Sequence, residues 1–286
     1  LEWRALHPRL RLAGGALAAG AVLLGTILAL SPPAPPREFT VSFLDVGQGD
    51  ATLLQDPSGA AVLFDGGRPE ARVVRLLRRA GVRRLTLLVA THQSADHHGG
   101  LEEVIERIPV DVLLENGDGT RDPSYRAMLA TARRRGVRRI PARAGQTLRA
   151  GDTRIRVLGP PPRPPGPPPE DPNERALVAV VSRGEFDLFL SADAESPSLA
   201  GLRIPPVEAM KVPHHGSADP GLPGLLRRLR PQLAAIEVGR GNSYGHPRPE
   251  TVRALRAAVP RVHRTDQDGT VRLRVEGGRA EVTTDR

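Results

Sequence analysis

The sequence predicts an α/β domain whose functional residues lie at the ends of β-strands. Short apolar runs bounded by glycine, proline and polar residues are typical of buried strands. Amphipathic segments between these runs are typical of helices that cover a sheet. Residues of metal-binding type follow four of the runs. Because α/β proteins bind ligands in crevices beyond the carboxyl ends of strands, we expect one shared site there.

The first element expected is a membrane helix over residues 12–30. This stretch carries no charge, and its length as a helix, roughly 28 Å, is close to the thickness of the hydrocarbon core of a bilayer. Arginines cluster before it, at Arg4, Arg9 and Arg11, which places the N-terminus in the cytoplasm. The alternative is a signal peptide cleaved near residue 31.

A stiff proline-rich linker ends this N-terminal part, residues 1–37, and a single domain is expected over residues 38–286. The proline-rich segment 159–172 is interpreted as an extended loop inside that domain, because strand-like runs continue on both sides of it.

The domain opens with two expected strands, within residues 39–56 and 59–67, which turn at glycine-containing bends. Residues 70–80 predict an amphipathic helix with apolar side chains on one face and arginines on the other. Residues 101–108 predict a second helix, and the acidic residues in its first turn suit the helix dipole.

Four later runs each end in a residue that can bind a metal. They are residues 85–90 before His92, 186–192 before Asp193, 207–212 before His214 and His215, and 233–238 before His246. If these strands are parallel neighbours, all of these residues collect along one edge of a shared sheet.

Each of these residues also has an ordinary structural interpretation. A lone histidine is usually a surface or core residue, and Asp193 suits the N-cap of a helix. The joint interpretation is stronger, because six of the eight histidines fall into three clusters that follow strands. For Asp45, Asp50 and Asp65, which lie in glycine-rich turns, a structural role is favoured, and Asp65 is the one expected nearest to the site.

Composition limits the chemistry of the site. The chain has no cysteine, so a metal must be held by histidine and carboxylate side chains. Its net charge of +9 favours an acidic partner such as nucleic acid or a membrane surface, although the arginine-rich composition weakens this signal. Aromatic residues make up only 3% of the chain, which argues against a stacking platform for single-stranded bases. Lys211 is the only lysine.

In order along the chain, six motifs resemble the C-terminal domain of the ComEC family of DNA-uptake proteins, which has the metallo-β-lactamase fold. They are "LDVGQGDA" (44–51), "DGG" (65–67), "HQSADHHGG" (92–100), "LSADAE" (190–195), "MKVPHHGS" (210–217) and "SYGHP" (243–247). The resemblance covers residues 39–275 and implies an αββα sandwich.

Ser94 departs from the family pattern, which has aspartate at this position. A serine hydroxyl is a weak ligand beside imidazole or carboxylate. The additional histidine of the wider superfamily is also missing, since none lies between His98 and His214. We therefore expect one firm metal site and one that is weak or empty.

The resemblance implies a metal-dependent phosphodiesterase, a nuclease acting on DNA during uptake in natural transformation, with zinc or manganese as one or two ions. It implies a location at the inner membrane and a channel portion in the same or another polypeptide. The arginines before residue 12 in turn place the hydrolase domain on the outer face of that membrane. The roles implied are metal ligation by His92, Asp96, His97, Asp193, His214 and His246, catalysis by Asp96, Lys211 and His215, and substrate contacts from Ser217, Asn242 and Tyr244.

Two other functions stay open at this point. One is a metallohydrolase of a small ester, amide or phosphoester. The other is a catalytically eroded module that binds DNA or assembles with an uptake channel.

Overall fold

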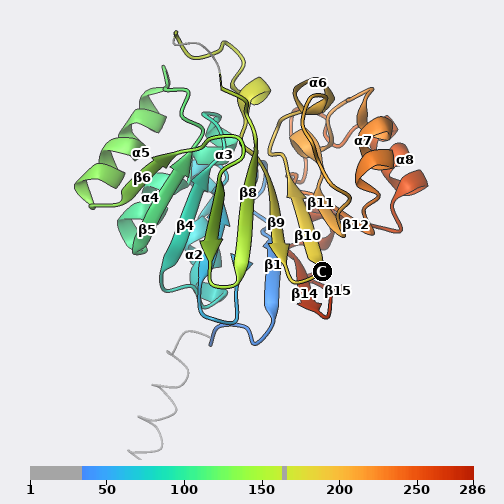
Figure 1. Cartoon of the computed structure of the whole chain (residues 1–286), viewed down its shortest axis with the longest axis horizontal. Helices are drawn as coiled ribbons and strands as arrows, with labels where there is room; N and C mark the ends of the chain where they lie inside the picture. The colour runs from blue at the N-terminus through green and yellow to red at the C-terminus, as the bar shows by residue number, and fades with distance from the viewer. Residues whose placement is uncertain (1–33, 163–165) are drawn as a thin grey trace, which may run out of the picture. The chain divides into compact units, whose positions relative to one another are not determined.

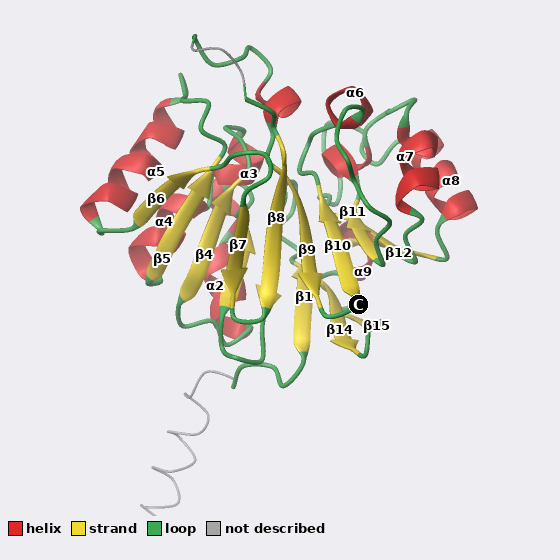
Figure 2. Cartoon of the chain, in the orientation of Figure 1, coloured by secondary structure: helices red, strands yellow, loops and turns green. Residues whose placement is uncertain are grey.

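Two β-sheets pack face to face and carry helices on their outer faces (Figures 1 and 2). The structure, a computed structural model, describes residues 34–162 and 166–286. The predicted membrane helix over residues 12–30 lies outside the described residues. Within the described ranges, no helix is both long and apolar enough to cross a bilayer.

The first sheet has eight strands in the described residues, in the order β15-β14-β1-β2-β3-β4-β5-β6. Their bounds are β1 (Phe39–Phe43), β2 (Thr52–Gln55), β3 (Ala61–Phe64), β4 (Leu85–Ala90), β5 (Val110–Glu115), β6 (Arg138–Pro141), β14 (Val271–Glu276) and β15 (Arg279–Thr284). Strands β3 to β6 are parallel, and the remaining pairs are antiparallel.

The second sheet has seven described strands, in the order β13-β12-β11-β10-β9-β8-β7. Their bounds are β7 (Thr147–Ala150), β8 (Thr153–Gly159), β9 (Val178–Arg183), β10 (Phe186–Leu190), β11 (Ala209–Lys211), β12 (Leu233–Ile236) and β13 (Arg261–Arg264). Strands β10 to β13 are parallel. The proline-rich segment 159–172 joins β8 to the short helix before β9, and these two strands are neighbours in the sheet.

Helices flank both sheets. Next to the first sheet lie η1 (Pro69–Ala71), α2 (Val73–Arg79), α3 (Ala95–His98), α4 (Leu101–Arg107) and α5 (Pro123–Arg134). In the later part of the chain come η2 (Pro172–Arg175), α6 (Ser196–Leu199), η3 (Pro213–Gly216), α7 (Leu222–Leu229), α8 (Pro249–Ala258) and α9 (Thr265–Asp268). Figure 1 shows α4 and α5 beside β5 and β6, and α7 and α8 beside β11 and β12, at opposite sides of the domain.

Three buried clusters hold these layers together. The central one lies between the sheets and joins Val41 and Val89 of the first sheet to Leu188 of the second. A second cluster packs helices such as α2 and α5 on the first sheet, and a third packs α7 and α8 on the second. The layers therefore run helix, sheet, sheet, helix, which confirms the predicted αββα sandwich.

The prediction that all four ligand-bearing strands share one sheet is wrong in one respect. Strands β10, β11 and β12 are parallel neighbours, as expected. Strand β4 lies in the other sheet, between β3 and β5. A parallel strand buried on both faces gives the same apolar run whichever sheet it joins, so the sequence does not separate the two cases. The residues after β4 therefore reach the site from the opposite layer.

Candidate metal centre

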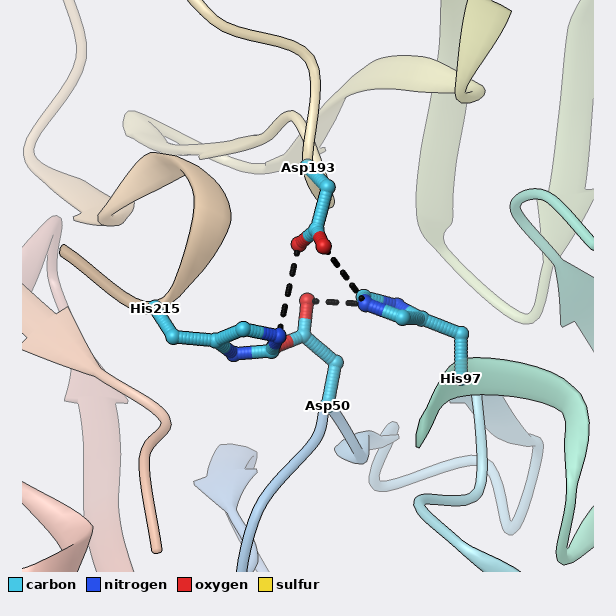
Figure 3. A group of neighbouring side chains, drawn as sticks. All are labelled: Asp50, His97, Asp193 and His215. Atoms are coloured by element: carbon cyan, nitrogen blue, oxygen red, sulfur yellow. Dashed lines mark ion pairs between the residues drawn. The ribbon is translucent and has the colours of Figure 1, made fainter. Parts of the chain in front are cut away.

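Four buried side chains from distant segments converge at one place (Figure 3). Asp50 lies in the loop between β1 and β2, His97 in α3 after β4, Asp193 after β10, and His215 in η3 after β11. Each offers one ligand atom, and these atoms all lie within 4.8 Å of one another. Among the described residues, this is the group whose geometry suits a metal ion.

Buried atoms without a hydrogen-bond partner gather around this group. They are Asp50 Oδ1, His92 Nε2, His97 Nε2, Asp193 Oδ1 and His215 Nε2. An unpaired buried polar atom costs about 1–3 kcal/mol, so several at one place indicate a shared partner. Imidazole nitrogen and carboxylate oxygen together suit a divalent cation such as zinc or manganese. The residues present therefore fit a divalent metal.

The glycine-rich motifs allow the loops of the centre to approach closely. The backbone N–H of Asp50 donates to the carbonyl of Asp96 (3.1 Å), and that of Gly66 donates to the carbonyl of His97 (2.8 Å). Gly49 has a φ of +128°, and a Cβ there would lie 2.0 Å from the Asp96 oxygen. Only glycine fits at position 49, so this residue locks the first loop against the histidine loop.

Left-handed backbone conformations gather at the same place. Asp65 (φ 58°), Ala192 (φ 48°), His214 (φ 46°) and His215 (φ 52°) all lie within the loops that form the centre. Such conformations are unfavourable for residues other than glycine and persist only where the surroundings enforce them. Their concentration here indicates that the loops are shaped to aim side chains at the centre.

A set of outer hydrogen bonds orients the histidine rings. Asp65 accepts from His97 Nδ1 (2.8 Å) and from the backbone N–H and hydroxyl of Thr91. His215 Nδ1 donates to the carbonyl of Glu237 (2.8 Å). In both rings the hydrogen bond at Nδ1 leaves Nε2 facing the centre, which is how outer carboxylates and carbonyls position metal-binding histidines.

The lone lysine places a positive charge beside the carboxylates. Lys211 Nζ lies 2.5 Å from Asp50 Oδ2 and 3.7 Å from Asp193 Oδ1, and it donates to the carbonyl of Ala192 (2.8 Å). Burial acts to lower the pKa of Lys211, but Asp50 and Asp193 raise it above its ordinary value. Burial likewise acts to raise the pKa of Asp50, and Lys211 with the two histidines lowers it to about 2. The two groups form a buried ion pair.

The histidines of the centre differ in protonation. Burial acts to lower the pKa of His215, but Asp193 and Asp50 raise it to about 10, and they raise the pKa of His97 as well. Without a cation both rings hold a second proton at neutral pH. A metal must displace those protons, so metal binding here is expected to weaken as the pH falls. Burial and the neighbouring His97 lower the pKa of His92 to about 3, so His92 is neutral.

Further predicted ligands surround the four-residue group. His92 and His97 have ring centroids 4.2 Å apart. Asp96 Oδ2 lies 3.5 Å from His215 Nε2, and its Oδ1 accepts from the Ser94 hydroxyl (2.7 Å). His214 Nδ1 bonds Glu195 (2.8 Å), and its Nε2 lies 3.7 Å from Asp193 Oδ2.

His246 lies one ring further out, with its centroid 5.5 Å from that of His214. The predicted ligands thus share one neighbourhood, in which His214 and His246 stand at the periphery. Whether they ligate an ion stays a prediction.

The three predicted substrate contacts lie in different settings. The Ser217 hydroxyl is buried and donates to Glu195. The Asn242 amide bonds the backbone of Gly239, Tyr244 and His246, and so it shapes its own loop. Tyr244 is 48% exposed at the rim of the centre.

Two buried acids complete the centre and were not predicted as part of it. Asp50 was favoured as a structural turn residue, yet it is a member of the metal group. The Glu237 carboxylate is fully buried and accepts from Ala51 N–H (3.1 Å) and the Thr52 hydroxyl (3.0 Å). Burial and the nearby Asp50 raise the pKa of Glu237 to about 8. The sequence held a weak indication of this role for Asp50. The glycines that precede it, Gly47 and Gly49, permit its loop to approach other loops closely.

A cleft of ≈ 530 Å³ opens the centre to solvent. Asp193 and His214 lie in its lining, together with Glu195 and Arg175. A substrate can therefore reach the inner carboxylate while most of the metal group stays buried.

Comparison with known proteins agrees with this arrangement. The chain is 28% identical to ComE operon protein 3 of Bacillus subtilis, over 85% of this chain and 34% of that protein. It is also 28% identical to Competence protein ComA of Neisseria gonorrhoeae, over 88% of this chain and 35% of that protein. These matches confirm the resemblance expected from the motifs. The chain spans about a third of the length of these relatives.

The fold is similar to that of YhfI from Bacillus subtilis, described as a metallo-beta-lactamase fold protein, with a TM-score of 0.54 at 11% identity. This likeness covers 81% of the chain and 98% of YhfI. A family model described as "Metallo-beta-lactamase superfamily" matches residues 44–235, which is more than half of the chain. On this match and this fold, the protein belongs to the metallo-beta-lactamase superfamily.

Proposed function

We propose that the chain is a metal-dependent phosphodiesterase that cleaves DNA at the membrane during DNA uptake. The observation that carries the proposal is the convergence of unpaired imidazole and carboxylate atoms on one buried point beside an open cleft. Similarity to a protein named for competence supports DNA as the substrate. The net charge of +9 suits a polyanion.

In this proposal, Asp50, His97, Asp193 and His215 hold a divalent ion, zinc or manganese. His92 and Asp96 lie beside them as further ligands, and His214 and His246 stand at the outer edge. A bound ion of this kind lowers the pKa of its water toward 7 and neutralises charge on a phosphate oxygen.

The side chains of the chain supply the remaining chemistry. The Lys211 ammonium, held by Asp50 and the Ala192 carbonyl, is a fixed positive charge that stabilises the negative charge of the reacting phosphate. His214 lines the cleft and is bonded to Glu195. Burial acts to lower the pKa of His214, but Glu195 and Asp193 raise it. From its position in the lining of the cleft, a protonated His214 would give its proton to the leaving oxygen.

Nuclease assays on the metal-depleted full chain test this proposal. The protein is reloaded with Mn²⁺, Zn²⁺ or no metal, its metal content is measured, and it is incubated with labelled single- and double-stranded DNA of one sequence. We expect cleavage only with metal, and loss of cleavage in His97→Ala. His263→Ala is the matched control, because His263 lies on β13 and pairs with Asp268 outside the centre. Metal-loaded protein that cleaves neither DNA would overturn the proposal.

A non-catalytic DNA-binding module is the second candidate, and one observation favours it. The Ser94 hydroxyl is committed to Asp96, so position 94 adds no free donor to the centre. If the chain is such a module, its affinity for DNA should be the same with and without metal. His97→Ala should then bind DNA as tightly as the unaltered chain and, like it, should not cleave it. The phosphodiesterase predicts the opposite on both counts.

A further inference from the structure

An exposed tyrosine stands at the rim of the metal centre. Tyr244 is 48% exposed, and among the described residues no other large hydrophobic side chain is classed as exposed. The second tyrosine of the chain, Tyr125, is buried. A lone exposed aromatic ring is ordinary on a protein surface. Its position next to His246, a predicted ligand of the metal centre, needs a separate account.

The Tyr244 ring is held in place. Its backbone N–H donates to the Asn242 side chain (3.2 Å), and its hydroxyl accepts from Arg68 Nη2 (2.7 Å). The Arg68 guanidinium carbon lies 5.8 Å from the ring centroid, within the range of a cation–π contact. Because the Arg68 contacts already restrict the Tyr244 ring, the ring loses little entropy when a ligand stacks on it, which favours a binding role.

A row of rings leads from Tyr244 to the metal group. The Tyr244 and His246 centroids are 6.0 Å apart with an interplanar angle of 31°, and His246 and His214 follow at 5.5 Å. His214 Nε2 lies 3.7 Å from Asp193 Oδ2, one of the four convergent residues. A group stacked on Tyr244 would therefore lie two rings away from Asp193.

Arg68 also has a free donor at this rim. Its Nε is buried and has no hydrogen-bond partner in the described structure. Arginine suits phosphate oxygens because its planar group offers several donors. The Nε itself is covered, so a phosphate next to a base stacked on Tyr244 would meet the terminal nitrogens of the half-buried Arg68 guanidinium.

We propose that Tyr244 is a stacking platform for one nucleobase of the substrate and that Arg68 fixes the ring and contacts the adjoining phosphate. This inference rests on the proposed phosphodiesterase function. It adds that the protein recognises a base of the substrate and not only its phosphates. It confines stacking to a single base, which one exposed ring can hold although the low aromatic content of the chain argues against a stacking platform in general. Because every base has a π-face, the platform is indifferent to sequence.

Two single-stranded oligonucleotides of equal length test the proposal, one of thymidines and one whose sugars carry no base. Both present the same phosphates. Binding is measured by fluorescence anisotropy in Ca²⁺, and cleavage is measured in Mn²⁺. Stacking of one base changes affinity roughly 5- to 150-fold, so the unaltered chain should prefer the thymidine strand by such a factor. Tyr244→Leu should lose that preference, and Tyr244→Phe should keep most of it.

The outcomes separate this inference from the proposed function. A base preference in binding without cleavage of either strand overturns the phosphodiesterase and leaves the platform standing. Equal binding of both strands by the unaltered chain, or an unchanged preference in Tyr244→Leu, overturns the platform. Arg68→Gln should lower the salt dependence of binding, by roughly 0.7 in the slope of log K against log salt for one phosphate contact. If the slope is unchanged in Arg68→Gln, Arg68 does not contact a phosphate.

Discussion

Replacement of Lys211 by methionine tests the electrostatic balance of the centre. The side chain is 1% exposed and its ammonium pairs with Asp50 at 2.5 Å. Methionine keeps the unbranched shape of the side chain and removes the charge. Asp50 and Asp193 then keep only the histidines His97 and His215 as cationic partners, so the metal-free protein should be destabilised.

The size of the effect follows from the burial of the pair. Removing one partner of a buried ion pair costs about 3–5 kcal/mol, because the other charge stays uncompensated. The pKa of Asp50, lowered from 3.8 to about 2, corresponds to about 2.5 kcal/mol of stabilisation of its charged form, part of it from the histidines. We therefore expect a loss of about 3 kcal/mol in the free energy of unfolding. For a domain of this size that is a fall of roughly 6–12 °C in Tm.

A bound divalent ion should reverse most of this loss, since it supplies positive charge to the same two carboxylates. Unfolding in urea is measured for both proteins, in chelator and in saturating Mn²⁺. The two stability differences and the two metal affinities form a thermodynamic cycle, so Lys211→Met should bind metal more tightly by the amount of stability regained. A loss that falls from about 3 to about 1 kcal/mol in metal corresponds to roughly 30-fold tighter binding.

Arg107→Met is the control, because Arg107 forms an exposed i,i+4 ion pair with Glu103 on α4. Such pairs contribute only about 0.3–0.5 kcal/mol, and metal should not change that value. The reasoning fails if Lys211→Met is as stable as the unaltered chain in chelator, or if metal leaves its deficit unchanged.

Three further predictions concern the loops and the acids of the centre. Ser94→Asp should raise the bound metal per chain, measured by elemental analysis, because it restores a donor next to Asp96; unchanged stoichiometry refutes this. Gly49→Ala should destabilise the protein by more than Gly47→Ala, since both glycines have positive φ but a Cβ meets other atoms only at position 49. The pKa of Glu237 is about 8 in the fold and 4.5 as its ordinary value, so the folded state holds the proton more tightly. The stability it contributes is complete below about pH 4.5 and is lost as the pH rises through 8, a loss of about 5 kcal/mol. Urea unfolding in chelator should show this fall for the unaltered chain and a much flatter profile for Glu237→Gln.

Local pattern was enough to predict the strands that lead to the centre and two of the helices, α2 and α4. The run 85–90 is β4 itself. The runs 186–192, 207–212 and 233–238 contain β10, β11 and β12. These segments are predictable because burial on both faces requires a continuous apolar run. The position of β4 in the first sheet depends on its pairing with β3 and β5. A local run of apolar residues does not indicate which strands it will pair with.

The site was predictable where strands end in ligands and was missed where loops meet. His97, Asp193 and His215 follow apolar runs, and all three belong to the convergent group. Asp50 does not come directly after an apolar run. It ends a glycine-rich turn, and aspartate is common in turns because its side chain bonds the neighbouring backbone. Its role depends on Lys211, which arrives from the second sheet, and no pattern near position 50 records that contact.

The centre draws Asp50 and His97 from loops of one sheet and Asp193 and His215 from loops of the other. An ion held by all four is a cross-link between the halves of the sandwich, closing a loop that runs from Asp50 to His215. Neither half has a complete ligand set alone. The proposed hydrolytic activity therefore requires the loops of both sheets to be folded together.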